Sequence, residues 1–366
     1  MPLAAEVARS TVTIADAIAK DVRNCVRYSN WIEENPSLAT HMFKDVYIDR
    51  TCTLSEITLI GLPSGARLLG GGDYIVEVED QLIEEQYPVF RDRSVEHVLA
   101  VRAEVRPRQH VRGQCIMLAR FGIYTWGHWL GEILPKAVLV EKLFPKRYQF
   151  VLPIEVESDA SPDRPWSRIL QSLAAYGITA DRLVSVSFTH DTVFDDLFVI
   201  PSVWSDHMIH PVASEAMRSE IRIEPGSPTA GRVALRRLPG SGRTLDNQEE
   251  IYGVLQTVGF KTVVSGTLSF RDQVNLFRES DVVFATLGSD LSSLIFSPPG
   301  VQVITAAPSI FGDRFFYALI LDRSGTQIDL RGPIVGEAEA IAHRSRFRLD
   351  AGQLRHALEL LEEHGS

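Results

Sequence analysis

The sequence predicts an α/β protein that contains a parallel sheet with helices on both faces. Three observations support this fold class. Short apolar runs alternate with helical patterns of roughly 10–15 residues in the second half of the chain, which is typical of a wound parallel sheet. Apolar residues after Tyr124 recur at helical spacing. The composition, 45% hydrophobic and 23% charged, is that of a folded globular protein.

Length and charge narrow the class of protein further. At roughly 150 residues per domain, 366 residues suggest two domains or one large domain. A net charge of −10 argues against a generally basic nucleic-acid binder, so no nucleic-acid partner is expected. Three widely spaced cysteines without a Cys-x-x-Cys pair support neither a disulfide framework nor a Cys-based zinc site. The early residues are interrupted by charges and no run reaches ~18 apolar residues, so we expect a cytoplasmic protein without a transmembrane segment.

The N-terminal region contains two segments with different sequence patterns. Residues 1–45 are expected to be helical and amphipathic. A β-rich segment follows over 46–124, with short strands expected at 57–61, 67–69, 74–78 and 116–120. The glycines at 70–72 are interpreted as a turn, because no helical pattern follows them as it would follow a phosphate loop.

Residues 125–223 are expected to form a Rossmann-like part of the first domain. Helices are expected at 127–143 and 167–176, and strands at 148–152, 182–187 and 197–200. The stretch 224–229 is rich in Pro and turn-forming residues and is the best linker in the chain. We therefore predict a first domain over 1–223.

The second domain is predicted over 224–340, followed by a C-terminal helix within 341–366. Its strands are expected at 233–235, 261–264, 281–285 and 301–305. Asp246 with Glu249 is a capping-box variant, Ser269 with Asp272 caps the next helix, and a short helix is expected at 289–296. This alternation is Rossmann-like.

Two loops of the second domain are candidate ligand sites, because wound parallel sheets bind ligands beyond the carboxyl ends of their strands. The loop after 233–235 carries arginines, whose planar guanidinium groups pair with phosphate oxygens. In the loop after 281–285, glycine lets the backbone approach a ligand and a helix N-terminus favours an anion. The candidate ligand-binding residues are Arg236, Arg237, Arg243, Gly288, Ser289 and Ser292. The alternative is a capped helix beside a solvated arginine loop, and no G-x-G-x-x-G or Walker motif supports a dinucleotide or P-loop protein.

Carboxylates and histidines supply the candidate catalytic groups. Asp290 would repel a phosphate placed beside it and is better suited to sugar hydroxyls. His128 begins a helix and Glu132 lies four residues later on the same face. A helix N-terminus disfavours imidazolium, so His128 would stay neutral and accept a proton; the alternative is a packed or surface histidine. His207 and His210 have no assignable third ligand, so we predict no metal site.

These features coincide in one resemblance. The chain resembles glycosyltransferase family 61, which includes plant xylan arabinosyl- and xylosyltransferases, animal protein O-linked N-acetylglucosaminyltransferases and many bacterial proteins. In the first domain the similarity lies in His128-Trp129, Glu132 and Leu134-Pro135. In the second it runs through Val233-Ala234-Leu235-Arg236-Arg237, Arg243, Asn247, Glu249-Glu250, Gly259-Phe260, Leu268-Ser269-Phe270, Gln273 and residues 288–300. The family usually has histidine where this chain has Leu287, and asparagine where it has Ser293.

The resemblance implies a GT-B fold, in which two Rossmann-like domains face a cleft and the C-terminal one binds the donor nucleotide. It implies inverting transfer from a nucleotide-sugar, commonly UDP-linked, to a hydroxyl of a glycan or glycolipid such as a surface polysaccharide precursor. His128 would be the base, with Glu132 or Asp290 as orienter or second candidate. No cofactor beyond the donor is implied, a divalent metal is doubtful, and a homo-oligomer or peripheral membrane contact stays open. Two alternatives remain, a nucleotide-sugar-binding scaffold without turnover, favoured by Leu287, and a nucleotide-sugar epimerase.

Overall fold

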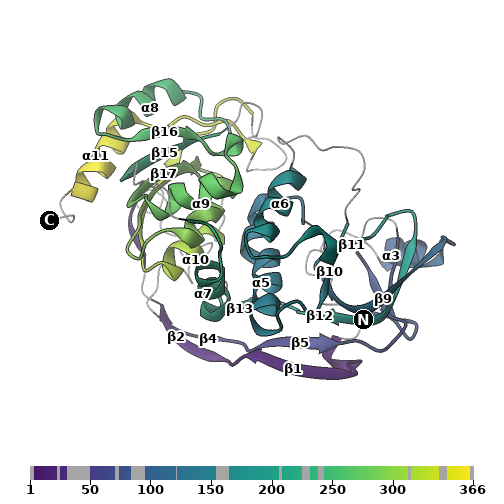
Figure 1. Ribbon diagram of the computed structural model, residues 1–366. Coiled ribbons are helices and arrows are strands. Elements are labelled where there is room, and N and C mark those ends of the chain that lie inside the picture. Colours follow the sequence, from purple (N-terminus) through teal and green to yellow (C-terminus); the bar gives the residue numbers. More distant parts are fainter. Residues whose placement is uncertain are drawn as a thin grey trace. The chain divides into compact units, whose positions relative to one another are not determined.

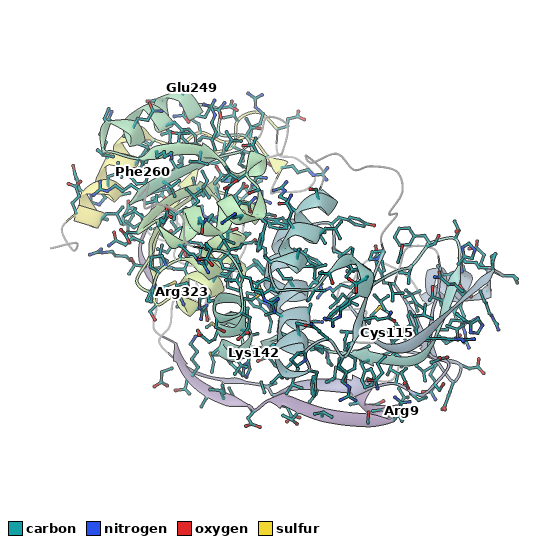
Figure 2. All side chains as sticks on the ribbon, in the orientation of Figure 1. Arg9, Cys115, Lys142, Glu249, Phe260 and Arg323 are labelled. Atoms are coloured by element: carbon teal, nitrogen blue, oxygen red, sulfur yellow. The ribbon has the colours of Figure 1, made fainter. Side chains whose placement is uncertain are left out.

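The computed structural model is shown in Figure 1. It describes residues 4–22, 25–30, 50–70, 74–83, 95–120, 122–153, 165–205, 208–224, 231–237, 243–311, 315–337 and 344–362. The chain divides into two compact units. Unit 1 contains Met1–Ile18, Thr53–Ser205 and His210–Arg222, and unit 2 contains Ala19–Cys52, Asp206–Ile209 and Ile223–Ser366. Side chains fill the space between helices and sheet within each unit (Figure 2).

Unit 1 is built on a mixed sheet. Its described strands run in the spatial order β11-β10-β9-β12-β6-β7-β8, and β5 pairs with both β12 and β1. The neighbours among β11, β10, β9 and β12 are parallel, whereas the other pairs are antiparallel. The strands are β1 (Ser10–Ala15), β5 (Ile57–Gly61), β6 (Arg67–Leu68), β7 (Val76–Val78), β8 (Gln81–Leu82), β9 (Arg108–Met117), β10 (Gln149–Leu152), β11 (Leu183–Ser185) and β12 (Asp191–Val199).

The parallel part of this sheet has a topological switch point. The chain forms β9, then β10 and β11 on one side of it, and returns to place β12 on the other side. The order therefore reverses between β9 and β12, which is where such sheets open a ligand crevice. The helical elements of unit 1 are η1 (Ala4–Glu6), α3 (Val95–Ala103), α4 (Trp126–His128), η3 (Trp129–Ile133), α5 (Leu134–Leu143), α6 (Pro165–Ala174), η4 (Ala180–Arg182) and α7 (Pro211–Ser219).

Unit 2 contains a parallel sheet in the order β16-β15-β17-β18-β19-β3. Here the order reverses between β15 and β17, so these two strands flank the second switch point. Its strands are β3 (Val26–Ser29), β15 (Arg232–Arg236), β16 (Lys261–Val264), β17 (Val282–Thr286), β18 (Gln302–Pro308) and β19 (Thr326–Gly332). Its helical elements are α8 (Gln248–Thr257), η5 (Ser265–Thr267), α9 (Phe270–Arg278), η6 (Ser289–Phe296), α10 (Phe315–Asp322) and α11 (Ala351–Glu362). Four further short strands form two described pairs. Strand β2 (Ile18–Val22) pairs with β4 (Arg50–Leu54), and β13 (Trp204–Ser205) pairs with β14 (Met208–Ile209).

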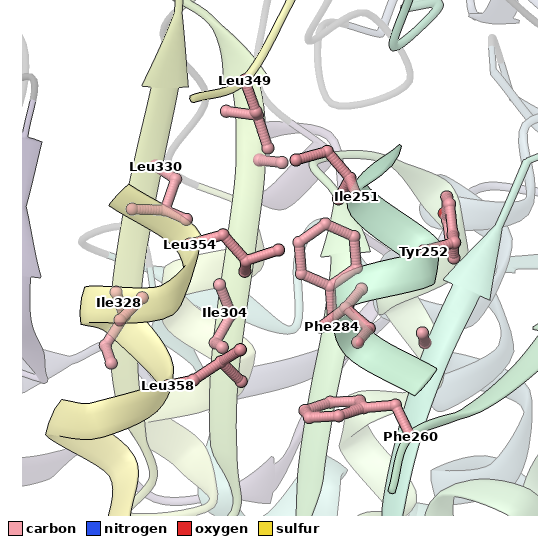
Figure 3. Close-up of a cluster of buried hydrophobic side chains, with 14 of the residues drawn as sticks. Ile251, Tyr252, Phe260, Phe284, Ile304, Ile328, Leu330, Leu349, Leu354 and Leu358 are labelled. Atoms are coloured by element: carbon pink, nitrogen blue, oxygen red, sulfur yellow. The ribbon is translucent and has the colours of Figure 1, made fainter. Parts of the chain in front are cut away.

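One face of the unit 2 sheet is covered by α8 and α11 (Figure 3). Leu354 and Leu358 of α11 and Ile251 of α8 pack against Phe284 and Ile304 of the strands. Each such side chain contributes about 1.5–3 kcal/mol when fully buried. Helices α9 and α10 pack with η6 and lie on the other side of the sheet (Figure 1). The C-terminal helix is thus part of the unit 2 core.

The expected helical N-terminus is wrong in the described residues. Residues 10–15 form β1 and residues 26–29 form β3, which pairs in parallel with β19 of unit 2. The run Thr11, Val12, Thr13 and Ile14 is entirely β-branched, a composition that fits strands better than helices. The units also differ from the expected domains 1–223 and 224–340, because unit 2 includes residues 19–52 and 206–209 in addition to the residues from 223 onward.

The expected alternation of elements after Tyr124 is found. A continuous helical segment runs from α4 through η3 into α5, and β10, α6, β11 and the end of β12 lie where strands and helices were expected. Ser269 accepts from the amide of Asp272 at 3.1 Å, as a helix cap should. The Asp246 cap is wrong, because Asn247 occupies the N-cap and the Asp246 carboxylate pairs with Arg346 at 2.7 Å. None of the described helices has the length and apolar composition needed to cross a bilayer.

Candidate functional site

Two arginines converge over Gly288 at the switch point of unit 2. Arg237 follows β15 and Gly288 follows β17, so both lie at the carboxyl edge of adjacent strands. A Cβ atom at Gly288 would lie 2.8 Å from Nη1 of Arg243 and would collide with Nη1 of Arg237. Two guanidinium groups packed against one glycine form a small cationic cradle, which suits a phosphate group.

Each arginine is held in place by its neighbours. Arg237 Nη1 lies 3.3 Å from the Asp290 carboxylate, whose other oxygen accepts from the Ser265 hydroxyl. Arg243 Nη1 donates to the Leu287 carbonyl, and its guanidinium carbon lies 4.9 Å from the centre of the Phe311 ring. Arg243 has φ 52°, a left-handed conformation that costs roughly 1–3 kcal/mol for a residue other than glycine and is typical of functional sites. Asp290 is therefore a partner of the cradle.

The backbone carbonyl of Phe311 contacts Arg331, which forms a buried ion pair with Asp329. Arg331 Nη1 donates to the Phe311 carbonyl, and Arg331 Nε lies 2.8 Å from Asp329. Burial alone would lower the pKa of Arg331, but the charge of Asp329 outweighs it and the pKa is raised. Asp329 also accepts from the Thr305 hydroxyl at 2.9 Å. Sequence reasoning missed Phe311 and Arg331, since neither lies in a recognisable motif.

The remaining predicted residues of this site lie differently. Arg236 points away from the cradle, because consecutive strand residues face opposite sides; its guanidinium pairs with Glu249 and lies 5.6 Å from the Tyr252 ring. Ser289 begins η6 and is half-buried. Ser292 is completely buried, and its hydroxyl has no hydrogen-bond partner among the residues described. The cradle thus assembles Arg237, Arg243, Gly288 and Asp290.

In unit 1, His128 and Glu132 are brought together as expected. His128 Nδ1 lies 2.7 Å from one oxygen of Glu132, and Arg120 Nη1 lies 2.7 Å from the other. These residues follow β9, at the switch point of this sheet. Gly122, with φ 83°, packs closely against the imidazole, because a Cβ there would lie 2.9 Å from Cδ2 of His128.

The ionisation of Glu132 determines the direction of its hydrogen bond with His128. Burial raises the pKa of Glu132, but the hydrogen bond from His128 and the charges of Arg120 and Lys136 more than offset it, so the pKa is lowered. An ionised carboxylate only accepts hydrogen bonds, so Nδ1 of His128 carries the hydrogen in this contact. The imidazole is 43% exposed and is accessible to a substrate.

A π-helical turn shapes the helix that carries the pair. Within η3 the amide of Leu134 bonds to the carbonyl of Trp129, five residues back. Pro135 has no N–H to offer the Gly131 carbonyl, which accepts instead from Trp204 Nε1 at 2.5 Å. The π-helical turn and the Trp204 hydrogen bond let the helix continue past Pro135, and Glu132 lies in the first turn of η3.

The next turn of this helix holds a buried lysine. Lys136 Nζ donates to the carbonyls of Ile200 and Pro201 at 2.6 and 3.0 Å, and burial lowers its pKa to about 7. Helical spacing could have indicated this lysine, since Lys136 lies four residues after Glu132 and eight after His128. Arg120 and Trp204 come from other elements and had no such signal.

Of the histidine pair considered as a metal site, the structure describes only His210. His207 lies outside the described residues. His210 caps α7, with Nδ1 accepting from the Val212 amide at 3.3 Å, and its Nε2 lies 3.0 Å from the Asp16 carbonyl. No group of three or more His, Cys, Asp or Glu residues gathers elsewhere in the described ranges.

The family model for Glycosyltransferase 61 matches residues 126–304. This part of the chain belongs to glycosyltransferase family 61. The matched region begins at the helix of His128 and Glu132 and ends in β18, so it includes both the unit 1 pair and the unit 2 cradle. The protein is accordingly an enzyme, a glycosyltransferase.

A solved structure is distantly similar over part of the chain. It is the dodecameric iron-containing heptosyltransferase TibC in complex with ADP-D-β-D-heptose, with 9% identity over 83% of this chain and 78% of that one. The TM-score of 0.28 is too low for that structure to guide the interpretation of this fold or its ligands. No curated protein sequence matches the chain.

Proposed function

We propose that this glycosyltransferase transfers a sugar, with inversion, from a UDP-linked nucleotide-sugar to a hydroxyl of a glycan acceptor such as a surface polysaccharide. In this proposal the units act as the two Rossmann-like domains of a GT-B enzyme. Unit 2 binds the donor and unit 1 presents the acceptor. The observation that carries the proposal is the convergence of Arg237 and Arg243 over Gly288 at the switch point of a parallel sheet.

The cradle suits the charge that develops during transfer. As the bond between the sugar carbon C1 and the phosphate oxygen breaks, the diphosphate gains negative charge. Arg237 and Arg243 are already held in position by Asp290, Leu287 and Phe311, so little reorganisation is needed to stabilise that charge. Asp290 acts here as a positioning residue for Arg237.

The acceptor side requires a base. Inversion needs the acceptor hydroxyl to attack C1 while its proton leaves, and Nε2 of His128 is the proton acceptor in this proposal. Glu132 fixes the imidazole through Nδ1 and stabilises the imidazolium that forms. The electron pair of the broken bond leaves on the diphosphate, so atoms and charge balance.

A nucleotide-sugar-binding scaffold without turnover is the second candidate, because Leu287 replaces the usual histidine. The side chain of Leu287 is fully buried, while its carbonyl holds Arg243. The cradle is therefore built from the backbone at this position, which favours a working donor site over an inactive one.

Calorimetric titration with UDP, GDP and CMP, with and without manganese, tests the donor site. We expect micromolar binding of UDP that is lost in Arg237→Ala and Arg243→Ala. Arg236→Ala is a matched control, since this neighbouring arginine faces Glu249, and it should bind UDP as the wild type does. Equal losses in all three variants, or no nucleotide binding at all, would refute the assignment.

A further inference from the structure

A preformed cavity lies in unit 1 beyond the carboxyl end of β12. Its volume is about 200 Å³, and its walls are the segment that follows β12 and the start of β5. Pro201, Val203 and Trp204 line it from the first wall and Ile57 from the second. Its polar lining residues are Ser55, Glu56, Thr58, Ser202, Ser205 and His210.

Hydrogen bonds fix both walls. The Ser55 amide donates to the Ser205 hydroxyl at 2.9 Å, which ties the two walls together. The Ser202 hydroxyl donates to the Trp204 carbonyl at 2.8 Å, and the His210 amide donates to the Val203 carbonyl at 2.9 Å. A cavity with walls tied in this way keeps its shape without a ligand, as binding sites usually do.

The chemistry of the lining matches one neutral sugar ring. Hydroxyl groups and one carboxylate can exchange hydrogen bonds with sugar hydroxyls, and the half-buried indole of Trp204 offers an apolar face to ring C–H groups. The lining holds no Lys or Arg, and both ring nitrogens of His210 are engaged, so an anionic ligand is not favoured. Sites for drug-sized ligands measure about 300–1,000 Å³, so this smaller cavity suits a single ring.

Two hydrogen bonds connect the cavity to the candidate base. Trp204, which lines it, donates from Nε1 to the carbonyl of Gly131, the residue before Glu132. Pro201, also in the lining, accepts from Lys136, one turn after Glu132. In addition, β12 and β9 are adjacent parallel strands, so the segments that follow them share one edge of the sheet.

We infer that this cavity is the subsite for a neutral sugar residue of the acceptor glycan. The inference rests on the proposed function, because only a glycosyl acceptor gives a sugar subsite beside His128 a role. Binding of the acceptor sugar there would hold its free hydroxyl on the side of the sheet from which the imidazole takes a proton.

Ligand-observed NMR tests the cavity without any donor. The probes are the methyl glycosides of glucose, galactose, mannose, rhamnose and N-acetylglucosamine, each measured by saturation transfer to wild type and variants. Ser55→Phe fills the cavity from an exposed position, and Glu56→Gln removes the carboxylate at constant size. Thr11→Phe is the matched control, an exposed residue on the strand paired with β5.

We expect saturation transfer to at least one glycoside in wild type and in Thr11→Phe, with at least tenfold weaker binding in Ser55→Phe and Glu56→Gln. All variants should bind UDP as the wild type does, which separates this test from that of the donor site. Absence of binding by every glycoside, or binding that Ser55→Phe leaves unchanged, would overturn the inference. A wild type that binds glycosides but no nucleotide would instead refute the proposed donor site.

Discussion

The substitution Gly288→Ala should separate ligand binding from stability. The backbone at Gly288 is extended, with φ 164°, so alanine fits its conformation. The three atoms nearest to the added Cβ would belong to the ends of two flexible side chains, those of Arg237 and Arg243. Shifting these guanidinium groups weakens their contacts with Asp290, Leu287 and Phe311 but leaves the apolar core intact, so the melting temperature should fall by a few degrees at most.

Donor binding should respond strongly to the same substitution. Moving one guanidinium group away from the diphosphate removes at least one charge-assisted hydrogen bond, worth about 1.5–3 kcal/mol. That free energy corresponds to a rise in the Kd for UDP of about 10- to 150-fold. Calorimetry and thermal unfolding measure the two quantities. Gly253→Ala is the control, because a Cβ there meets no atom within 4 Å and UDP binding should not change. Wild-type affinity in Gly288→Ala would refute the cradle.

Three further predictions concern the unit 1 helix. Trp204→Phe leaves the Gly131 carbonyl without its donor, so unfolding in urea should show a loss of about 1–3 kcal/mol, and kcat should fall while the Kd for UDP stays unchanged. Folding lowers the pKa of Glu132 below its ordinary 4.5. The ionised carboxylate therefore stabilises the folded protein above pH 4.5, and this contribution disappears as the pH falls through the lowered pKa. The free energy of unfolding, measured between neutral and acidic pH, should depend less on pH in Glu132→Gln than in wild type. Folding lowers the pKa of Lys136 from 10.5 to about 7, so between pH 7 and 10.5 the unfolded chain binds one more proton than the folded chain. The free energy of unfolding should therefore rise with pH in this range by up to ~1.4 kcal/mol per pH unit in wild type but not in Lys136→Met. If the free energy of unfolding of Lys136→Met had the same slope against pH as that of wild type, the buried lysine would be excluded as the cause of the slope.

The sequence predicted most of what local periodicity determines. The strands and helices of residues 231–305 were predictable because each apolar run lies within one element, although the cap expected at Asp246 was wrong. Gly288 and Arg237 were predictable as neighbours, since both follow adjacent strands of a parallel sheet. The pairing of His128 with Glu132 followed from helical spacing.

Features that depend on distant parts of the chain were not predictable. Strand β3 completes a sheet through a partner some 300 residues away, as the Ser29–Asp329 hydrogen bond shows. The direction of Arg236 depends on which of two consecutive residues faces α8, and a difference of one position reverses it. The indole of Trp204 reaches the Gly131 carbonyl across 73 positions, and no local pattern records that contact.

Release of nucleoside diphosphate from a UDP-sugar tests the central claim most directly. Wild type and His128→Ala are compared at saturating donor with an acceptor glycan present, and UDP affinity is measured on the same preparations. The account predicts steady release by wild type, little or none by His128→Ala, and equal UDP affinity in both. Turnover at the wild-type rate by His128→Ala would contradict the assignment of the base. Nucleotide binding without turnover by wild type, with an acceptor glycan present, would favour the scaffold.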